Sequence, residues 1–271
     1  MSEMQHTLWL WLEGVFPRRL AYFFLIKNLT PSVADLLAGR TTMRNMKLIP
    51  SHREMPPAVW SSSDPSDPPP EGATNPCLRI TDPATGKSRF LYESTSILLY
   101  LEELYPEYPM QPKGLIERAQ MHDMLGLISL IGSDTNYKLR NTIPPHGMMM
   151  GLMPENQSQT AAENAEMQEK KGLLKLLEWA KEFGCFEKGW LTPGVDGPGL
   201  VDVALVPNFR FVELVWGIDI LEDEDLKPFA EWYGRFKSLP FWKEYEERED
   251  ALPAMLAFGK TSRAAWIDSP Q

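Results

Sequence analysis

The sequence predicts an α/β domain followed by an all-α domain. In the first hundred residues, short β-favouring runs alternate with apolar helical patterns. Between Asn75 and Tyr105, a β-hairpin pattern leads directly into a helix. After a Pro- and Gly-containing linker, helical patterns resume at about Leu115 and continue through much of the chain. Strand patterns in the first part of the chain and helical patterns in the rest indicate two domains of unequal size.

The first elements are a strand and a helix. Residues 7–12 (TLWLWL) favour a strand, and Pro17 suits the first turn of an apolar helix that runs to about Leu29. One or two further helical turns are expected within residues 32–39. The best placement of a second strand is 46–49.

The hairpin has two β-favouring runs, residues 77–80 and 89–92, on either side of the turn formers at 82–87. A helix is expected from Ser94 until Pro106 stops it. Its apolar residues recur at helical spacing: Ile97, Leu98, Leu101 and Leu104.

The polar pair Glu93-Ser94 stands where this helix begins. A helix N-terminus presents unpaired N–H groups and the positive end of the macrodipole, so an anionic group beside Ser94 would be held by charge and hydroxyl together. Glu93 could pair with a cationic group of the same ligand, which fits an α-amino-acid head. The pair alone is also explained if Ser94 is only an N-cap and Glu93 only interacts favourably with the helix dipole, which suffices for most such pairs.

The joint pattern of Asn75-Pro76, the hairpin and Glu93-Ser94 resembles the glutathione transferase superfamily. The resemblance implies a thioredoxin-like domain over residues 1–106, a linker at 107–114 and an all-α domain over 115–271. It further implies a cis bond before Pro76 and glutathione as cosubstrate. Glu93 and Ser94 would hold the γ-glutamyl head, and the backbone of Asn75 would pair with the cysteinyl unit.

Two later segments extend the resemblance. The stretch from Gly199 to Asp202 looks like the buried helix start of the family's second domain, where the aspartate caps backbone amides. Glycine replaces the usual hydroxyl residue, so half of the capping box is missing. Residues 228–236 and the following Pro240 resemble a late helix and the turn that ends it.

A Pro-rich insertion is expected at about 51–74, because its prolines cannot supply a helix or a central strand. We expect an extended or partly mobile loop there. In the family, this region helps to bind the glycine carboxylate of glutathione, and the local candidates are His52 and Arg53. Both are explained equally well as solvated loop charges.

The position of the family's sulfur-stabilising residue falls within Glu13-Gly14-Val15-Phe16, where the usual Ser, Cys, Tyr or Asn is missing. The chemistry needs a hydrogen-bond donor to sulfur in a positive local field. The N–H groups of Val15 and Phe16, the helix dipole, and Arg18 or Arg19 are one source. Ionised Glu13 would work against a thiolate.

Three alternatives stay open. The catalytic group can come from the expected helix at 116–141, where Tyr137 is the main candidate and polar neighbours share its stripe: His122, Asp123, Asp134 and Arg140. Such a stripe is also typical of a solvated face. Alternatively, the protein binds glutathione without transferring it. The last alternative is an enzyme that uses this fold without glutathione, with an acid/base pair in the cleft between the domains drawn from the Asp, His and Tyr residues of the same helix.

Composition and net charge exclude several classes of function and of binding site. The chain has 271 residues, 43% of them hydrophobic, and a net charge of -10, which argues against nucleic-acid binding. Two cysteines and four histidines form no disulfide framework and no metal motif. The lack of a disulfide framework indicates a reducing, cytoplasmic environment. No segment resembles a membrane span, so a soluble protein is expected.

The expected function is conjugation, thiol-dependent elimination or glutathione-assisted isomerisation of a hydrophobic electrophile. The resemblance implies a homodimer. The Pro-rich insertion and the missing hydroxyl indicate a specialised member, with natural-product biosynthesis as a hypothesis. Residues 143–159, rich in Pro, Gly and Met, are expected to leave the helix and form a flexible lid.

Overall fold

The computed structural model describes residues 3–54 and 59–248, which divide into two compact units. Unit 1 comprises the residues up to Pro109 together with residues 240–248, and unit 2 is Met110–Leu239. The expected all-α domain at 115–271 is therefore not continuous. The segment from Pro240 returns to the first unit because its aromatic side chains pack on the first helix.

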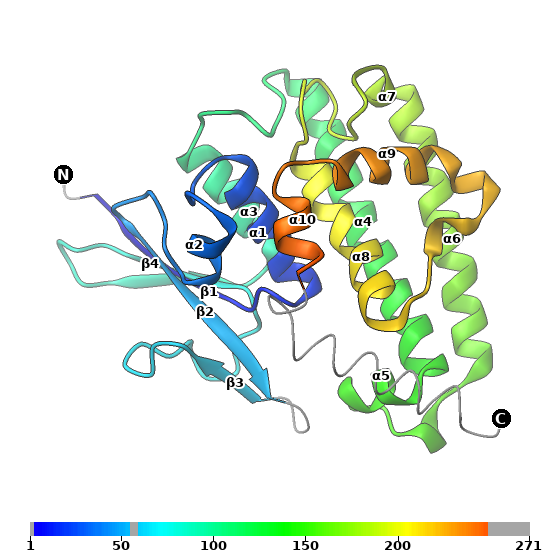
Figure 1. The fold of residues 1–271 in the computed structure, drawn as a ribbon, viewed down its shortest axis with the longest axis horizontal. Coiled ribbons are helices and arrows are strands. Elements are labelled where there is room, and N and C mark those ends of the chain that lie inside the picture. Colours follow the sequence, from blue (N-terminus) through cyan, green and yellow to red (C-terminus); the bar gives the residue numbers. More distant parts are fainter. Residues whose placement is uncertain (1–2, 55–58, 249–271) are drawn as a thin grey trace. The chain divides into compact units, whose positions relative to one another are not determined.

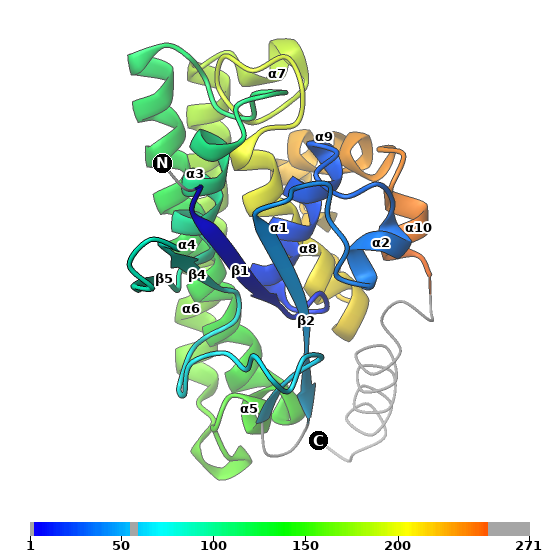
Figure 2. The same ribbon diagram turned by 90° about the vertical axis from the view of Figure 1, so that its left-hand side faces the viewer.

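Unit 1 is built on a five-stranded sheet with the strand order β3-β2-β1-β4-β5. β1 pairs in parallel with β2 and antiparallel with β4, so it lies at the centre, as Figure 2 shows. The elements of the unit in chain order are β1 (Gln5–Leu10), α1 (Val15–Ile26), α2 (Val33–Leu37), β2 (Met46–Glu54), β3 (Val59–Ser62), β4 (Cys77–Thr81), β5 (Ser88–Leu91), α3 (Ser94–Leu104) and α10 (Trp242–Glu246).

Different elements cover the two faces of the sheet. Successive side chains of a strand point to opposite faces, so the contacts of β1 show which element lies on which face. His6 on β1 contacts Tyr100 on α3 at 2.7 Å between Nε2 and Oη, so the face that carries His6 and Leu8 lies toward α3. Trp9 points to the opposite face, where it forms a buried cluster with Ile49 and Cys77. Ala73, from the loop before β4, packs on that cluster.

The Pro-rich segment is more ordered than the sequence predicts. β2 continues to Glu54, and β3 pairs antiparallel with its second half, with Ser51 opposite Ser62. Val59-Trp60-Ser61-Ser62 is a β-favouring run whose pattern is hidden by the prolines around it. An edge strand tolerates such neighbours because only one side of it must be paired.

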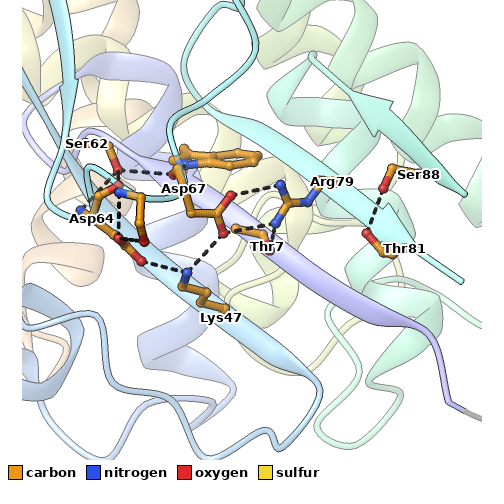
Figure 3. A network of polar contacts seen from close by, with 10 residues as sticks. Thr7, Lys47, Ser62, Asp64, Asp67, Arg79, Thr81 and Ser88 are labelled. Carbon is orange, nitrogen blue, oxygen red and sulfur yellow. Dashed lines mark hydrogen bonds and ion pairs between the residues drawn. The ribbon is translucent and has the colours of Figure 1, made fainter. Parts of the chain in front are cut away.

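A polar network fastens the loop after β3 to the sheet (Figure 3). Both carboxylate oxygens of Asp67 accept hydrogen bonds from Arg79 on β4, at 2.9 and 3.0 Å. Lys47 on β2 donates to Asp67 at 3.0 Å and to Asp64 at 2.7 Å. The indole N–H of Trp9 donates to the Asp67 carbonyl at 2.9 Å. The insertion therefore covers the Trp9 face of the sheet in place of a helix.

Unit 2 is helical, as expected, and Figure 1 shows its long helices α4 and α6 side by side. The expected lid at 143–159 is wrong in part, because residues 144–149 continue as a short helix whose first residues are prolines, which suit a helix start. The elements of the unit are α4 (Leu115–Thr142), α5 (Pro144–Met149), η1 (Pro154–Asn156), α6 (Gln159–Glu182), α7 (Cys185–Lys188), α8 (Leu200–Trp216), η2 (Ile220–Glu222), η3 (Glu224–Leu226) and α9 (Lys227–Lys237).

The start of α8 completes its capping box with a residue from elsewhere. Asp202 accepts from the N–H of Gly199 at 2.9 Å, which is the expected half. Thr192 supplies the missing hydroxyl, because its Oγ1 accepts the N–H of Val201 at 3.0 Å. A Cβ at position 199 would lie 2.4 Å from that Oγ1, so glycine is required there.

Candidate ligand-binding site

Three loops of unit 1 meet at the ends of α1 and α3. The N–H of Trp11, just after β1, donates to Oδ1 of Asn75 at 2.7 Å. The Asn75–Pro76 peptide bond is cis. From α1, Arg19 reaches the first residues of α3. Hydrogen bonds within a single unit therefore connect the loop before α1, the cis-proline loop and the N-terminus of α3.

The N-terminus of α3 is not capped by its own side chains. Glu93 is the N-cap residue and makes no side-chain capping bond, whereas Ser94 is the first helical residue. Ser94 is buried and Glu93 is exposed. The simple interpretation of Ser94 as an N-cap is therefore wrong, and the first amides of the helix are left for another acceptor.

Arg19 lies beneath this helix end and is almost fully buried, at 2% exposure. Its Nη1 makes long hydrogen bonds to Ser94 Oγ at 3.4 Å and to Thr95 Oγ1 at 3.5 Å. Its Nε and Nη2 have no hydrogen-bond partner among the residues that the structure describes. A buried guanidinium without a bound counter-charge lowers the stability of the fold. An anionic ligand group beside Arg19 would therefore be stabilised at this site.

The charge on Arg19 persists at neutral pH. Burial lowers the pKa of the guanidinium to about 10, and the nearby Glu93 carboxylate acts in the opposite direction. The ring of Phe16 faces the guanidinium carbon at 5.1 Å from the ring centroid, a cation–π distance. The cation therefore adds to the positive end of α3 at the same place.

The loop before α1 has no room for a catalytic hydroxyl. A Cβ built on Gly14 would lie 2.6 Å from Cε3 of Trp11 and 3.0 Å from Cδ of Pro17. Gly14 is the N-cap residue of α1, so the N–H groups of Val15 and Phe16 belong to the unpaired first turn. They and the helix dipole are the donors that this loop offers to an anionic sulfur.

Glu13 contributes a carboxyl group beside the same turn. Burial raises its pKa, against the opposing effects of a hydrogen bond with Trp11 and of the Arg18 charge. The raised pKa shifts the group toward its neutral form, which repels a thiolate less than the ionised form would.

No protein-family model matches the chain, and neither does any curated protein. Solved structures do match it. A Tau class glutathione S-transferase from mango, Mangifera indica, is 16% identical, with a TM-score of 0.62, and the match covers 95% of this chain and 98% of that one. The chain has the glutathione transferase fold.

Two further structures support this conclusion. A glutathione transferase family member from Pseudomonas fluorescens Pf-5, with bound S-(propanoic acid)-glutathione, is 15% identical over 89% of this chain and 99% of that one, with a TM-score of 0.59. A maleylacetoacetate isomerase from Anaeromyxobacter dehalogenans 2CP-1 is 16% identical over 94% and 95%, with a TM-score of 0.56.

Within the glutathione transferase fold, Arg18 differs from the sulfur-binding role expected for it. Its side chain is fully buried, and its Nε donates to Glu246 at 2.8 Å. Burial alone opposes the charge, but the facing Glu246 carboxylate raises the pKa of Arg18 above its usual value. Because the charge is neutralised in the core, Arg18 is poorly placed to stabilise a thiolate directly.

The other expected residues are less informative. His52 is exposed on β2, which fits either a ligand contact or a solvated charge, and the side chain of Arg53 lies outside the described part of the chain. In unit 2, the Tyr137 ring stacks on the Arg140 guanidinium at 3.5 Å. Burial raises the pKa of Asp134.

Across the described ranges 3–54 and 59–248, no hydrogen bond joins Tyr137 to His122, Asp123 or Asp134. An acid/base pair on α4 stays a prediction. The same ranges contain no cluster of His, Cys, Asp or Glu suited to a metal ion. None of their helices combines the length and apolar character that a membrane crossing requires.

Sequence reasoning named Arg19 only as an alternative to Arg18 and missed its position under Ser94. It also did not anticipate that Trp11 decides what can stand at position 14. A signal for the first was present: two adjacent arginines inside an apolar helix must each find a partner when the helix is buried. Pairing with Glu246 could not be anticipated, because it joins residues 228 positions apart.

Proposed function

We propose that unit 1 binds glutathione and that the protein is a glutathione transferase or a glutathione-dependent isomerase. The observation that supports this most strongly is the buried Arg19 under the N-terminus of α3, with two guanidinium nitrogens unpaired among the described residues. A γ-glutamyl α-carboxylate at Ser94 would supply the missing negative charge. The structure from Pseudomonas fluorescens holds a glutathione derivative, which adds support through the shared fold.

The polarity of the Ser94 hydroxyl favours the same ligand. Because Nη1 of Arg19 donates to Ser94 Oγ, the hydroxyl hydrogen is available to an acceptor outside the protein. The exposed Glu93 carboxylate stands at the adjacent position for the α-ammonium group. His52 and the backbone of Asn75 remain proposed contacts to the glycine carboxylate and the cysteinyl unit.

The sulfur would lie at the N-terminus of α1, held by the N–H groups of Val15 and Phe16. Such donors stabilise the thiolate over the thiol, which is the main contribution that a protein makes to thiol addition. The thiolate then forms a C–S bond with an electrophilic carbon of the second substrate. Either the π bond of a conjugated C=C group breaks and its electron pair takes up a proton from water, or the bond to a leaving group breaks and the group departs with its electron pair. The Phe16 side chain, 49% exposed beside this turn, supports a hydrophobic acceptor.

A binding protein without turnover is the second candidate, and the contact between Gly14 and Trp11 favours it. Since the ring occupies the space for a side chain at position 14, no hydroxyl can be restored there by a small adjustment. Ser94 and Arg19 would bind glutathione in either case.

Calorimetric titration with glutathione, combined with the ultraviolet difference spectrum of the bound thiolate against pH, separates the two. Binding with a thiol pKa well below that of free glutathione supports the transferase, and binding with an unchanged thiol pKa supports the binding protein. Ser94→Ala is expected to weaken binding by about 1.5–3 kcal/mol, as for a hydrogen bond to a charged group. Ser96→Ala, an exposed serine of the same helix turn, is the matched control. Absence of binding by the unaltered protein would reject both candidates.

A further inference from the structure

Helix α10 belongs to unit 1 although the described part of unit 2, Met110–Leu239, precedes it in the chain. Figure 1 draws it in orange beside the blue α1. The Tyr22 ring of α1 stacks on Trp242 at 6.2 Å between centroids and meets Tyr245 edge-on at 6.0 Å. All three side chains are almost fully buried, so α10 is a part of the core of unit 1 and not an attached tail.

The polar contacts of α10 converge on the loop before α1. The Tyr245 hydroxyl donates to the carbonyl oxygen of Leu12 at 2.8 Å. Glu246 Oε1 accepts from Arg18 Nε at 2.8 Å and from the Tyr22 hydroxyl at 2.7 Å. Held in this way, Arg18 donates through Nη1 to the carbonyl oxygen of Glu13 at 3.0 Å. Two successive carbonyl groups of the loop are thus fixed, one by α10 directly and one through Arg18.

Fixing these carbonyls also fixes the directions of the amides that follow them. In a trans peptide the N–H points opposite to the preceding C=O, so the N–H groups of Glu13 and Gly14 are turned away from Tyr245 and Arg18. Gly14 N–H closes a turn on the Trp11 carbonyl at 3.1 Å. This turn sets the N-cap of α1, and with it the positions of the Val15 and Phe16 amides.

We propose that Tyr245 and the Arg18–Glu246 pair are positioning residues that hold the sulfur-binding turn at residues 11–16 in its donor geometry. The inference rests on the proposed function for the identity of the ligand. Packing alone does not require these polar groups, because replacing a buried ion pair by apolar side chains of similar volume is often neutral or stabilising. Their contacts with two consecutive carbonyl groups of the turn indicate that they fix the orientation of its peptide groups.

Tyr245→Phe tests the proposal, since it keeps the ring and removes only the hydroxyl that reaches Leu12. Amide exchange is followed by NMR in the free protein at the two hydrogen-bonded N–H groups of the turn, those of Trp11 and Gly14. We expect exchange there to accelerate by about tenfold, as for the loss of one hydrogen bond. Tyr105→Phe is the control, because it removes a hydroxyl that donates to Asn45 at 3.2 Å in the same unit.

The ligand provides a second readout. In Tyr245→Phe, the pKa of the bound glutathione thiol should rise by about one unit. The affinity for S-methylglutathione, which has no ionisable thiol, should stay within about twofold of the unaltered protein. A general loss of structure would weaken both ligands and would not separate them in this way.

Arg18→Lys serves if Tyr245→Phe does not fold, since it keeps a cation opposite Glu246 and loses the fork that also reaches Glu13. It should accelerate exchange at Gly14. Unchanged exchange at both amides, or equal acceleration in Tyr105→Phe, overturns the proposal. If the unaltered protein does not lower the thiol pKa, the transferase function fails, and the exchange experiment still decides whether α10 positions the turn.

Discussion

The indole ring of Trp11 occupies the space above Gly14, where a Cβ would lie 2.6 Å from Cε3 and 2.9 Å from Cζ3. The pair explains why the loop before α1 offers backbone N–H groups in place of a hydroxyl. The tryptophan ring and the glycine three positions later are thus sterically coupled, so the size of the side chain at one position limits what the other position can hold.

Gly14→Ser should destabilise the protein by about 1–3 kcal/mol, as overpacking of a filled site does. Equilibrium unfolding in urea measures the loss. Trp11→Leu in the same chain should recover part of it, so that the double variant is more stable than the sum of the single effects requires. Gly126→Ser is the control, because a Cβ at that position meets nothing within 4 Å. Full additivity of the two changes would contradict the proposed steric coupling.

Arg19→Met should separate stability from binding. Removing a buried charge that lacks a full set of partners is expected to leave the free energy of unfolding unchanged or to raise it by about 1 kcal/mol. Glutathione affinity should fall by about tenfold or more, because a charge-assisted interaction with the carboxylate is lost.

The control for Arg19→Met is Arg89→Met, an exposed arginine of the same unit. A γ-glutamyl analogue without the α-carboxylate should bind Arg19→Met and Arg89→Met with equal affinity. Normal glutathione binding by Arg19→Met would remove the main support for the anion site.

Asp202→Asn should strongly destabilise unit 2. The carboxylate accepts hydrogen bonds from the N–H groups of Leu191 at 2.8 Å and Gly199 at 2.9 Å, and from the Trp232 indole at 2.7 Å. An amide presents an NH₂ group where one oxygen now accepts, so at least one buried donor loses its partner. We expect a loss of about 3 kcal/mol in thermal or urea unfolding. An effect below the error of measurement would show that the network rearranges freely.

The loop after β3 should detach from the sheet in acid. A hydrogen bond from Lys47 holds the pKa of Asp64 at about 2, below the value of 3.8 for an unperturbed side chain. Because the folded pKa is the lower one, the contact stabilises the loop above about pH 4 and is lost as the pH falls toward about 2.

The fluorescence of Trp9, whose indole donates to the Asp67 carbonyl, can be followed between those pH values. Several other tryptophans contribute signal, so a Trp9→Phe protein supplies the background to subtract. Lys47→Met should reduce the part of the transition that comes from Asp64. The part that comes from Asp67 should remain, because the hydrogen bond with Arg79 also lowers the pKa of that carboxyl. A transition of unchanged size in Lys47→Met would contradict the role of the Lys47–Asp64 contact.

Local sequence patterns predicted the parts of the fold that local chemistry determines. The hairpin, α3 from Ser94 to Leu104 and the start of α8 lie where spacing and turn formers indicate. β3 was missed because prolines surround a four-residue β-favouring run, and its pairing with β2 depends on the sheet. The return of residues 240–248 to unit 1 was missed because aromatic packing over such a separation leaves no local signal.

In the candidate site, too, the residues set by local sequence could be predicted and those set by distant packing could not. Glu93 and Ser94 could be proposed from their place at a helix start. The sequence could not decide whether Arg18 or Arg19 lies beneath them. Adjacent helical residues point about 100° apart. Only the neighbours packed on α1 determine which arginine is paired and which faces Ser94. The Glu246 carboxylate makes that choice.

The division of unit 1 into two sequence segments affects its biosynthesis. A ribosome produces Glu246 only after the segment Met110–Leu239 of unit 2, so for a time on the order of ten seconds Arg18 of the growing chain lacks its carboxylate partner. During that interval the surface of α1 that later receives Trp242 and Tyr245 is open to chaperones and to other nascent chains. The segment Met110–Leu239 can therefore fold before unit 1 is complete, although it is translated after Met1–Pro109, and a chain that stops before Pro240 would have a first unit without α10.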